Sequence, residues 1–182
     1  MTVSPPTPAT PSGSGSEQRD GRALLLAAHT QPIAYTPLTQ IPTTGEATYL
    51  GYLYGTLANT SDGITDGLSA DLELQIGFTP SGVLVGGSVE NFFDASDAPI
   101  TGSLTLSAGA LDRSGNPNDD ATFQVSAQGQ LIEADGDQLD FGSLLEGDFL
   151  GAQHEALGGA VFGRVEHNGT AQDFDGGFIT QR

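Results

Sequence analysis

The segment "GDFLGAQHEALGGAVFGRVEHNG" (residues 147–169) decides the fold of this chain. It holds two of the three histidines, and each stands beside a glutamate: His154 precedes Glu155, and His167 follows Glu166. Two interpretations compete, a reactive site and a piece of architecture. On both sides of "GAQHEA" apolar residues alternate with glycines and polar residues, which is typical of strands. The segment therefore predicts a strand, a loop and a second strand.

The same alternation continues upstream of this segment. In "LSADLELQIGF" (residues 68–78) apolar side chains alternate with polar ones, as in a strand with one wet face. Similar runs recur along the chain, separated by turn sequences such as "TPSG" and "HNGTAQ". The eight predicted strands cover residues 47–57, 68–78, 82–93, 100–108, 121–135 (with a turn or bulge at Gly129 as an open alternative), 139–151, 157–167 and 173–181.

The short connections between these strands predict antiparallel neighbours. Eight such strands with alternating faces favour an all-β fold, a single antiparallel eight-stranded up-and-down β-barrel. Closure removes the exposed edges of so strand-rich a chain, and glycines inside the strands suit tight curvature.

The composition changes sharply near residue 43. Seven of the ten prolines precede this point, whereas 23 of the 26 glycines and all nine phenylalanines follow it. Residues 1–44 are predicted to form a flexible Pro/Ser/Gly-rich N-terminal arm. Within it, residues 21–29 suit a short helix, and the proline-spaced "TQPIAYTPLTQIP" suits an extended path against a surface. Residues 45–182 form the predicted barrel.

The charge of the chain limits its partners. Five arginines stand against 23 acidic residues, which gives a net charge of -18. Such a surface repels phosphate backbones and anionic lipids, so we expect no binding of nucleic acid. The longest apolar run, "ALLLAA", is too short to span a bilayer, and we expect no direct membrane insertion. The absence of cysteine excludes disulfides, thiolate catalysis and zinc–thiolate sites.

The glycines and phenylalanines of the opening segment, together with "DFDGGFITQR" behind it, match a family pattern at Gly147, Phe149, Gly151, Glu155, Gly158, Gly159, Gly177 and Phe178. With "GEATYLGYLYGTL" as the first strand, residues 45–182 resemble the C-terminal barrel of the transferrin-binding protein B family. The resemblance implies an extracellular or outer-cell-surface protein that captures a host protein or an iron- or haem-bearing ligand through its loops. The amino terminus has no signal-peptide pattern, and the anchoring cysteine of many family members is absent.

Two minor ligand hypotheses accompany this interpretation. The loop "DRSGNPNDD" offers oxygen ligands of the kind that calcium prefers, and "DGDQLD" adds Asp135, Asp137 and Asp140. The calcium candidates in the first loop are Asp112, Asn116, Asn118 and Asp120. For haem, to which the resemblance draws attention, His29 and Tyr35 are the candidate axial ligands.

The histidines of the opening segment do not form a catalytic pattern. His154 and Glu155 are adjacent, and a zinc-protease helix would need a histidine where Gly158 stands. We predict that this pair belongs to a loop between strands. His167 precedes the typical turn pair Asn168 and Gly169 and is predicted to be an exposed turn residue. Without a nucleophile elbow or a phosphate loop, the chain is predicted not to be an enzyme.

The sequence thus favours a non-enzymatic barrel that binds a protein partner through its loops, with iron acquisition as the implied context. One alternative is a structural or assembly subunit whose N-terminal arm docks on neighbouring chains and displays the barrel. Another is a secreted haem-binding protein. Whether residues 21–44 lie against another chain or against their own barrel distinguishes the first two.

Overall fold

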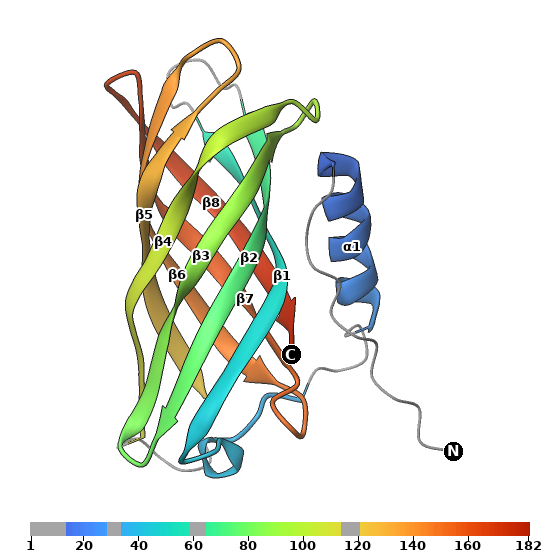
Figure 1. The fold of residues 1–182 in the computed structure, drawn as a ribbon, viewed down its shortest axis with the longest axis vertical. Helices are drawn as coiled ribbons and strands as arrows, with labels where there is room; N and C mark the ends of the chain where they lie inside the picture. Colours follow the sequence, from blue (N-terminus) through green and yellow to red (C-terminus); the bar gives the residue numbers. More distant parts are fainter. Residues whose placement is uncertain (1–13, 29–33, 59–64, 114–120) are drawn as a thin grey trace.

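The computed structural model describes residues 14–28, 34–58, 65–113 and 121–182 of the chain, and these form a closed antiparallel barrel with a helix on its outside (Figure 1). Each strand pairs with the next in sequence, and β1 pairs with β8, so the predicted eight-stranded up-and-down barrel is confirmed. The strands are β1 (Gly45–Ala58), β2 (Thr65–Thr79), β3 (Gly82–Asp94), β4 (Pro99–Asp112), β5 (Thr122–Ile132), β6 (Gln138–Leu150), β7 (Ala156–His167) and β8 (Thr170–Gln181).

The alternative of a turn or bulge at Gly129 is not what the structure has. β5 runs through Gly129 without a turn or bulge, because Gly129 pairs in unbroken register with Leu104 on one side and Phe141 on the other. A Cβ atom at position 129 would lie 2.2 Å from the carbonyl oxygen of Ser103. The glycine is needed there for close approach of β4, and not for a change of direction.

The inside of the barrel is filled with apolar side chains. Near the end where β6 meets β7, which we call the lower end, the ring of Phe149 is fully buried. Its centroid lies 6.3 Å from that of Tyr49, 6.2 Å from Phe78 and 5.8 Å from Phe123. Near the opposite, upper end, the rings of Phe141 and Phe174 pack at 5.4 Å. An eight-stranded barrel has an interior just wide enough for such side chains, which here make one continuous core.

Part of the N-terminal arm closes the lower end. The amide of Thr36 donates to the carbonyl of Phe149 at 2.8 Å, and the amide of Gly151 donates to the carbonyl of Ala34 at 2.9 Å. After this contact the short 3-10 helix η1 (Leu38–Gln40) turns the chain, and Leu38 and Ile41 are buried in the barrel core. The arm therefore supplies apolar side chains to its own barrel.

A guanidinium group holds this arm in place. Arg113, directly after β4, donates hydrogen bonds to the carbonyls of Leu38, Ile41 and Pro42. Burial lowers the pKa of Arg113. One side chain thus satisfies three carbonyl oxygens of an irregular segment, whose groups have no ladder partners of their own.

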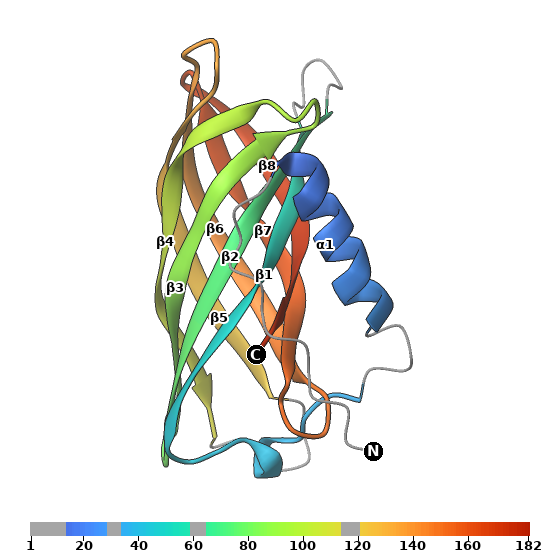
Figure 2. The same ribbon diagram turned by 45° about the vertical axis from the view of Figure 1, so that its right-hand side comes forward.

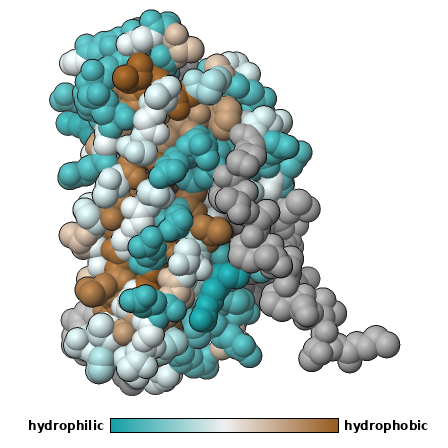
Figure 3. Space-filling model, viewed as in Figure 1, coloured by the Kyte–Doolittle hydropathy of each residue, from teal (hydrophilic) through white to brown (hydrophobic). Residues whose placement is uncertain are grey.

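The helix α1 (Gly15–Ala28) lies along the outer wall and contacts β1, β2 and β8 (Figure 2). It begins earlier than the predicted residues 21–29 because Ser14 and Glu17 form a capping box, with Ser14 N donating to Glu17 Oε2 at 2.7 Å. The sequence "SGSE", assigned to the tether, was the missed helix-start signal. The outer wall itself mixes hydrophilic and hydrophobic residues (Figure 3).

Candidate functional site

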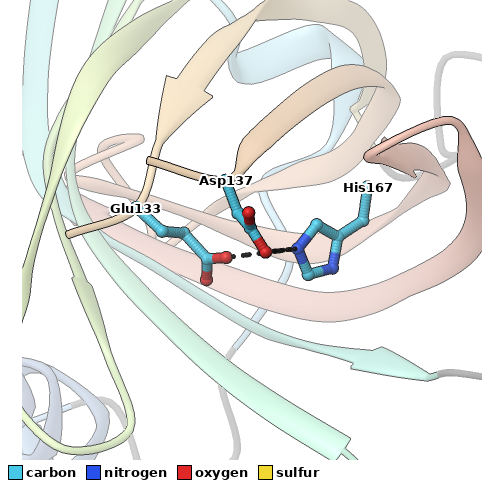
Figure 4. Close-up of side chains that lie close together, drawn as sticks. All are labelled: Glu133, Asp137 and His167. Carbon is cyan, nitrogen blue, oxygen red and sulfur yellow. Dashed lines mark ion pairs between the residues drawn. The ribbon is translucent and has the colours of Figure 1, made fainter. Parts of the chain in front are cut away.

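Three side chains that can each offer one metal-ligand atom meet at the upper end of the barrel: Glu133, Asp137 and His167 (Figure 4). Glu133 directly follows β5 and Asp137 directly precedes β6, so both belong to one hairpin turn. That turn is fixed by a hydrogen bond from the amide of Glu133 to the carbonyl of Asp137, at 2.9 Å. Gly136 completes it with a φ of 96°, which a residue with a side chain rarely adopts.

The third side chain comes from the neighbouring hairpin. His167 is the last residue of β7, and it pairs with Leu139 of β6. The next residue, Asn168, donates its amide to the carbonyl of Gln138 at 3.2 Å and accepts the amide of Gln138 on Oδ1 at 3.3 Å. These bonds hold the two hairpin turns side by side, so the imidazole of His167 faces the two carboxylates.

The distances within the cluster are short. His167 Nε2 lies 3.3 Å from Glu133 Oε2 and 3.4 Å from Asp137 Oδ2. The side chains of His167 and Glu133 are 22% and 25% exposed, and that of Asp137 is 43% exposed. The other ring nitrogen, Nδ1, lies 3.1 Å from Nε2 of Gln172, a buried residue of β8.

This arrangement corrects the prediction for His167. Asn168 and Gly169 do form the expected turn, but His167 ends the strand before it and its ring is half-buried. The ring turns toward the adjacent β5–β6 hairpin instead of toward water. Neither Glu133 nor the pairing of this hairpin with His167 was identified from the sequence, because the three residues are brought together only by the β6–β7 register.

The other histidine of the opening segment has a structural setting. His154 lies in the loop between β6 and β7 with a φ of 47°, and its ring packs edge-on against Phe78 at 5.9 Å. Its carbonyl accepts the hydroxyl of Tyr49 at 2.7 Å. Burial, together with the charge of Arg182, lowers the pKa of His154. The expected loop between strands is present, and His154 helps to close the lower end.

Glu155 also serves this loop. Its carboxylate accepts the amide of Gln153 at 2.8 Å and occupies the space beside Gly151, where a Cβ atom would lie 2.2 Å from it. His154 and Glu155 thus make separate contacts, and neither lies in the cluster at the upper end.

The glycines of the family-like pattern have steric roles. Gly147 on β6, Gly159 on β7 and Phe178 on β8 stand opposite one another in register. A Cβ atom at position 147 would lie 2.4 Å from the ring of Phe178, so the ring crosses the place left by the glycine. On the outer side, Gly158 borders Leu150 and Ile179, and Gly177 borders the hydroxyl of Tyr54.

The candidate haem ligands are only partly within the described residues. Tyr35 forms an isolated bridge with Leu150 at the lower end, and it is 52% exposed. His29 lies outside the described residues. The hypothesis of axial ligation by this pair stays a prediction.

The same holds for the first calcium loop. Asp112 is the last residue of β4, whereas Asn116, Asn118 and Asp120 lie outside the described residues. In the second acidic segment, Asp140 accepts amide hydrogen bonds from Gln130 at 2.9 Å and Gln138 at 2.7 Å, which lower its pKa. Asp135 accepts the amide of Asp137 in the turn. Only Asp137 of this segment belongs to the cluster with Glu133 and His167.

A polar cluster that the sequence did not indicate joins α1 to the barrel. Asp71 on β2 accepts hydrogen bonds from Gln18 Nε2 at 3.1 Å and Asn91 Nδ2 at 2.8 Å, and both Gln18 and Asp71 are buried. Burial, with a smaller contribution from the charge of Glu90, raises the pKa of Asp71 although the two hydrogen bonds act to lower it. Asn91 lies in a bulge of β3 with a φ of 53°. Above this contact, Arg19 pairs with Asp97 at 2.5 Å.

A cleft of about 390 Å³ opens between α1 and the upper part of the barrel. Its lining includes Arg19 from the helix, Thr56 and Ser69 from β1 and β2, and Asp175 from β8. The cleft is on the outer wall, at the helix–barrel junction, and not inside the barrel.

Comparison of the chain with protein-family models, with curated proteins and with solved structures gives no match. Within the described part of the chain, no helix is both long and apolar enough to cross a membrane.

Proposed function

We propose that the protein is a non-enzymatic binding barrel that holds a protein ligand on its outer surface and end loops. The observation that carries this proposal is the filled interior: Phe149, Phe123 and Leu145 are fully buried among other apolar side chains inside the barrel. Barrels that store a small molecule keep an internal cavity for it, whereas this core occupies that space. Binding on the outside is the mode that such a barrel supports best.

The outer wall supports a cationic partner. On the face formed by β5 and β6, Gln124 donates to Glu146 at 2.6 Å and Gln130 donates to Asp140 at 2.9 Å. These carboxylates are paired with neutral amides, so their negative charge is kept. With a net charge of -18, the wall attracts basic protein surfaces and repels nucleic acid. Charged side chains at mid-strand also suit water and not lipid, in support of a barrel that does not insert into a membrane.

The resemblance to the transferrin-binding protein B barrel supplies the biological context of the proposal. It favours a secreted or outer-cell-surface protein that takes part in iron acquisition by capturing an iron- or haem-bearing ligand. The closed eight-stranded barrel is compatible with that resemblance.

The alternative of an assembly subunit is less well supported. Leu38 and Ile41 of the arm are buried in the core of their own barrel, and Arg113 of that barrel binds the arm's carbonyls. A segment engaged in this way is not available to dock on a neighbouring chain. The second alternative, a haem-binding protein, makes its own prediction: incubation with hemin should produce a Soret band.

The test is biolayer interferometry with the full chain immobilised. The analytes are iron-loaded transferrin, iron-free transferrin and hemin, with lysozyme as a basic control protein. At about 150 mM salt, charges more than about 8 Å apart are largely screened, so binding through long-range charge attraction alone should be strongly weakened. The proposal expects saturable binding of an iron-bearing protein under these conditions. Binding of lysozyme alone, or of no analyte, would refute capture of an iron-bearing protein, and binding of hemin alone would favour the haem-binding alternative.

A further inference from the structure

We propose that Glu133, Asp137 and His167 bind one divalent cation of the zinc class at the upper end of the barrel. The three side chains offer one imidazole nitrogen and two carboxylate oxygens, a ligand set that suits zinc and similar transition metals. This site lies among the end loops at the upper end of the barrel. The binding of a cation there does not depend on the proposed protein-binding function.

The spacing of the ligand atoms fits tetrahedral coordination. With metal–ligand distances of about 2.0–2.2 Å, two ligands of a tetrahedral zinc ion lie about 3.3–3.6 Å apart. His167 Nε2 lies 3.3 Å from Glu133 Oε2 and 3.4 Å from Asp137 Oδ2, and all three atoms lie within 4.8 Å of one another. One ion can therefore contact all three with small side-chain adjustments.

The state of His167 points independently to a ligand. Its Nε2 atom is buried and forms no hydrogen bond among the described residues, although it lies within ion-pair distance of both carboxylates. A buried polar atom without a hydrogen bond costs free energy, which a bound cation would offset. The atom is directed toward both carboxylates (Figure 4).

The surroundings of the cluster are suited to orient the imidazole. Gln172 is only 7% exposed, and its side-chain amide contacts Nδ1 of His167 at 3.1 Å. When the amide oxygen and nitrogen of Gln172 exchange places, the oxygen can accept a hydrogen bond from a proton on Nδ1 of His167. In that tautomer Nε2 carries no proton, and its lone pair is available to the metal. The hydrogen bond between Glu133 and Asp137 and the pairing of His167 with Leu139 fix the backbone on both sides.

The ligand count distinguishes the metal class. Calcium takes six to eight oxygen ligands and does not favour imidazole, whereas zinc is satisfied by three protein ligands and one water molecule. The half-buried cluster at the tip of two hairpins leaves such a position open toward the solvent. The strongly acidic chain raises the local concentration of any cation, so specificity has to be tested against charge alone.

The experiment is isothermal titration calorimetry of the untagged full chain with zinc chloride, after treatment with a chelator. We expect one site per chain, and His167→Gln, Glu133→Gln and Asp137→Asn should each weaken it by at least about tenfold. The matched controls are His154→Gln, which removes the other histidine beside a glutamate, and Asp135→Asn, which removes a carboxylate from the same turn. Both controls should bind zinc as the wild type does.

Cobalt provides a second readout, which reports the coordination geometry of the bound metal. Co²⁺ in a tetrahedral site absorbs visible light much more strongly than hydrated Co²⁺, so its spectrum should intensify with the wild type and the controls but not with His167→Gln. Circular dichroism checks that each variant is folded. Zinc binding that survives His167→Gln, zinc binding that is lost equally in His154→Gln, or the absence of a stoichiometric site would each overturn the proposal.

Discussion

The row formed by Gly147, Gly159 and Phe178 gives the sharpest test of how the opening segment sets the fold. We predict that Gly159→Ala strongly destabilises the barrel. A Cβ atom at position 159 would lie 2.0 Å from the carbonyl oxygen of Glu146 and 2.5 Å from the Cα atom of Gly147. Both are backbone atoms, so no side-chain rotation relieves the contact, and β6 and β7 have to separate by about 1 Å in a close-packed barrel.

The magnitude follows from this displacement. Overpacking of a core costs about 1–3 kcal/mol and occasionally more, and a clash with backbone places Gly159→Ala near about 3 kcal/mol. For a chain of this size, 182 residues, each kcal/mol lowers the melting temperature by about 2–4 °C. The expected loss is therefore about 6–12 °C.

Gly142 on the neighbouring strand β6 is the matched control. A Cβ atom there has only the carbonyl oxygen of Arg164 nearby, at 3.9 Å. Gly142→Ala should therefore be neutral or raise stability by about 0.4–1 kcal/mol, because alanine reduces the freedom of the unfolded chain. Urea unfolding followed by circular dichroism measures both variants. An unchanged midpoint for Gly159→Ala, or an equal loss for Gly142→Ala, would show that strand approach does not require the glycine.

Three further variants test the other contacts. Burial raises the pKa of Asp71 above its usual 3.8, so the folded state binds a proton at this carboxylate more readily than the unfolded state does. The stability of the wild type relative to Asp71→Asn should therefore rise as the pH falls toward 3.8. Melting temperatures of both proteins at several pH values test this, and a difference that does not change with pH would contradict it. Arg113→Ala should lower the free energy of unfolding by about 2–3 kcal/mol and speed amide hydrogen exchange at residues 38–42. Arg164→Ala, at an exposed position, should do neither. Equal exchange rates in the two variants would show that the guanidinium group of Arg113 does not hold the arm in place. Phe149→Ala should cost about 3–5 kcal/mol and Phe149→Leu clearly less, in the same urea assay; similar losses would argue against tight packing of the ring.

The fold was predictable because strand signals are local. In β2, the buried residues Leu72, Leu74 and Ile76 alternate with Glu73 and Gln75, which are less buried. This period of two can be read from the sequence without any knowledge of the tertiary structure. Short turn sequences then fixed the antiparallel order. The start of α1 was missed although its signal is also local, because the capping pair Ser14 and Glu17 stands inside a run that otherwise resembles a linker.

The candidate metal cluster could not be predicted in the same way. Glu133 and Asp137 are close in sequence, but His167 is distant, and only the β6–β7 register places it beside their turn. Acidic residues are so abundant in this chain that a pair of carboxylates carries little information. The polar contact beneath α1 is similar, since Gln18 and Asp71 meet only after the helix docks on the closed wall.

The two ends of the barrel differ in a way that bears on binding. At the lower end, Leu38 and Ile41 fill the opening and the loop with His154 packs over Phe78, while α1 covers part of the wall at β1, β2 and β8. At the upper end, α1 contacts the β3–β4 turn through Arg19 and Asp97, whereas the β5–β6 and β7–β8 turns carry no covering segment among the described residues (Figure 1). A partner that binds through loops would therefore meet the upper end, beside Glu133, Asp137 and His167.

A cation bound by these three residues would rigidify two adjacent hairpins. Zinc is therefore expected to change the affinity of the partner for that end of the barrel. In the interferometry assay, His167→Gln should abolish this dependence of partner binding on zinc. Partner binding that responds to zinc equally in the wild type and in His167→Gln would separate the metal from the binding surface.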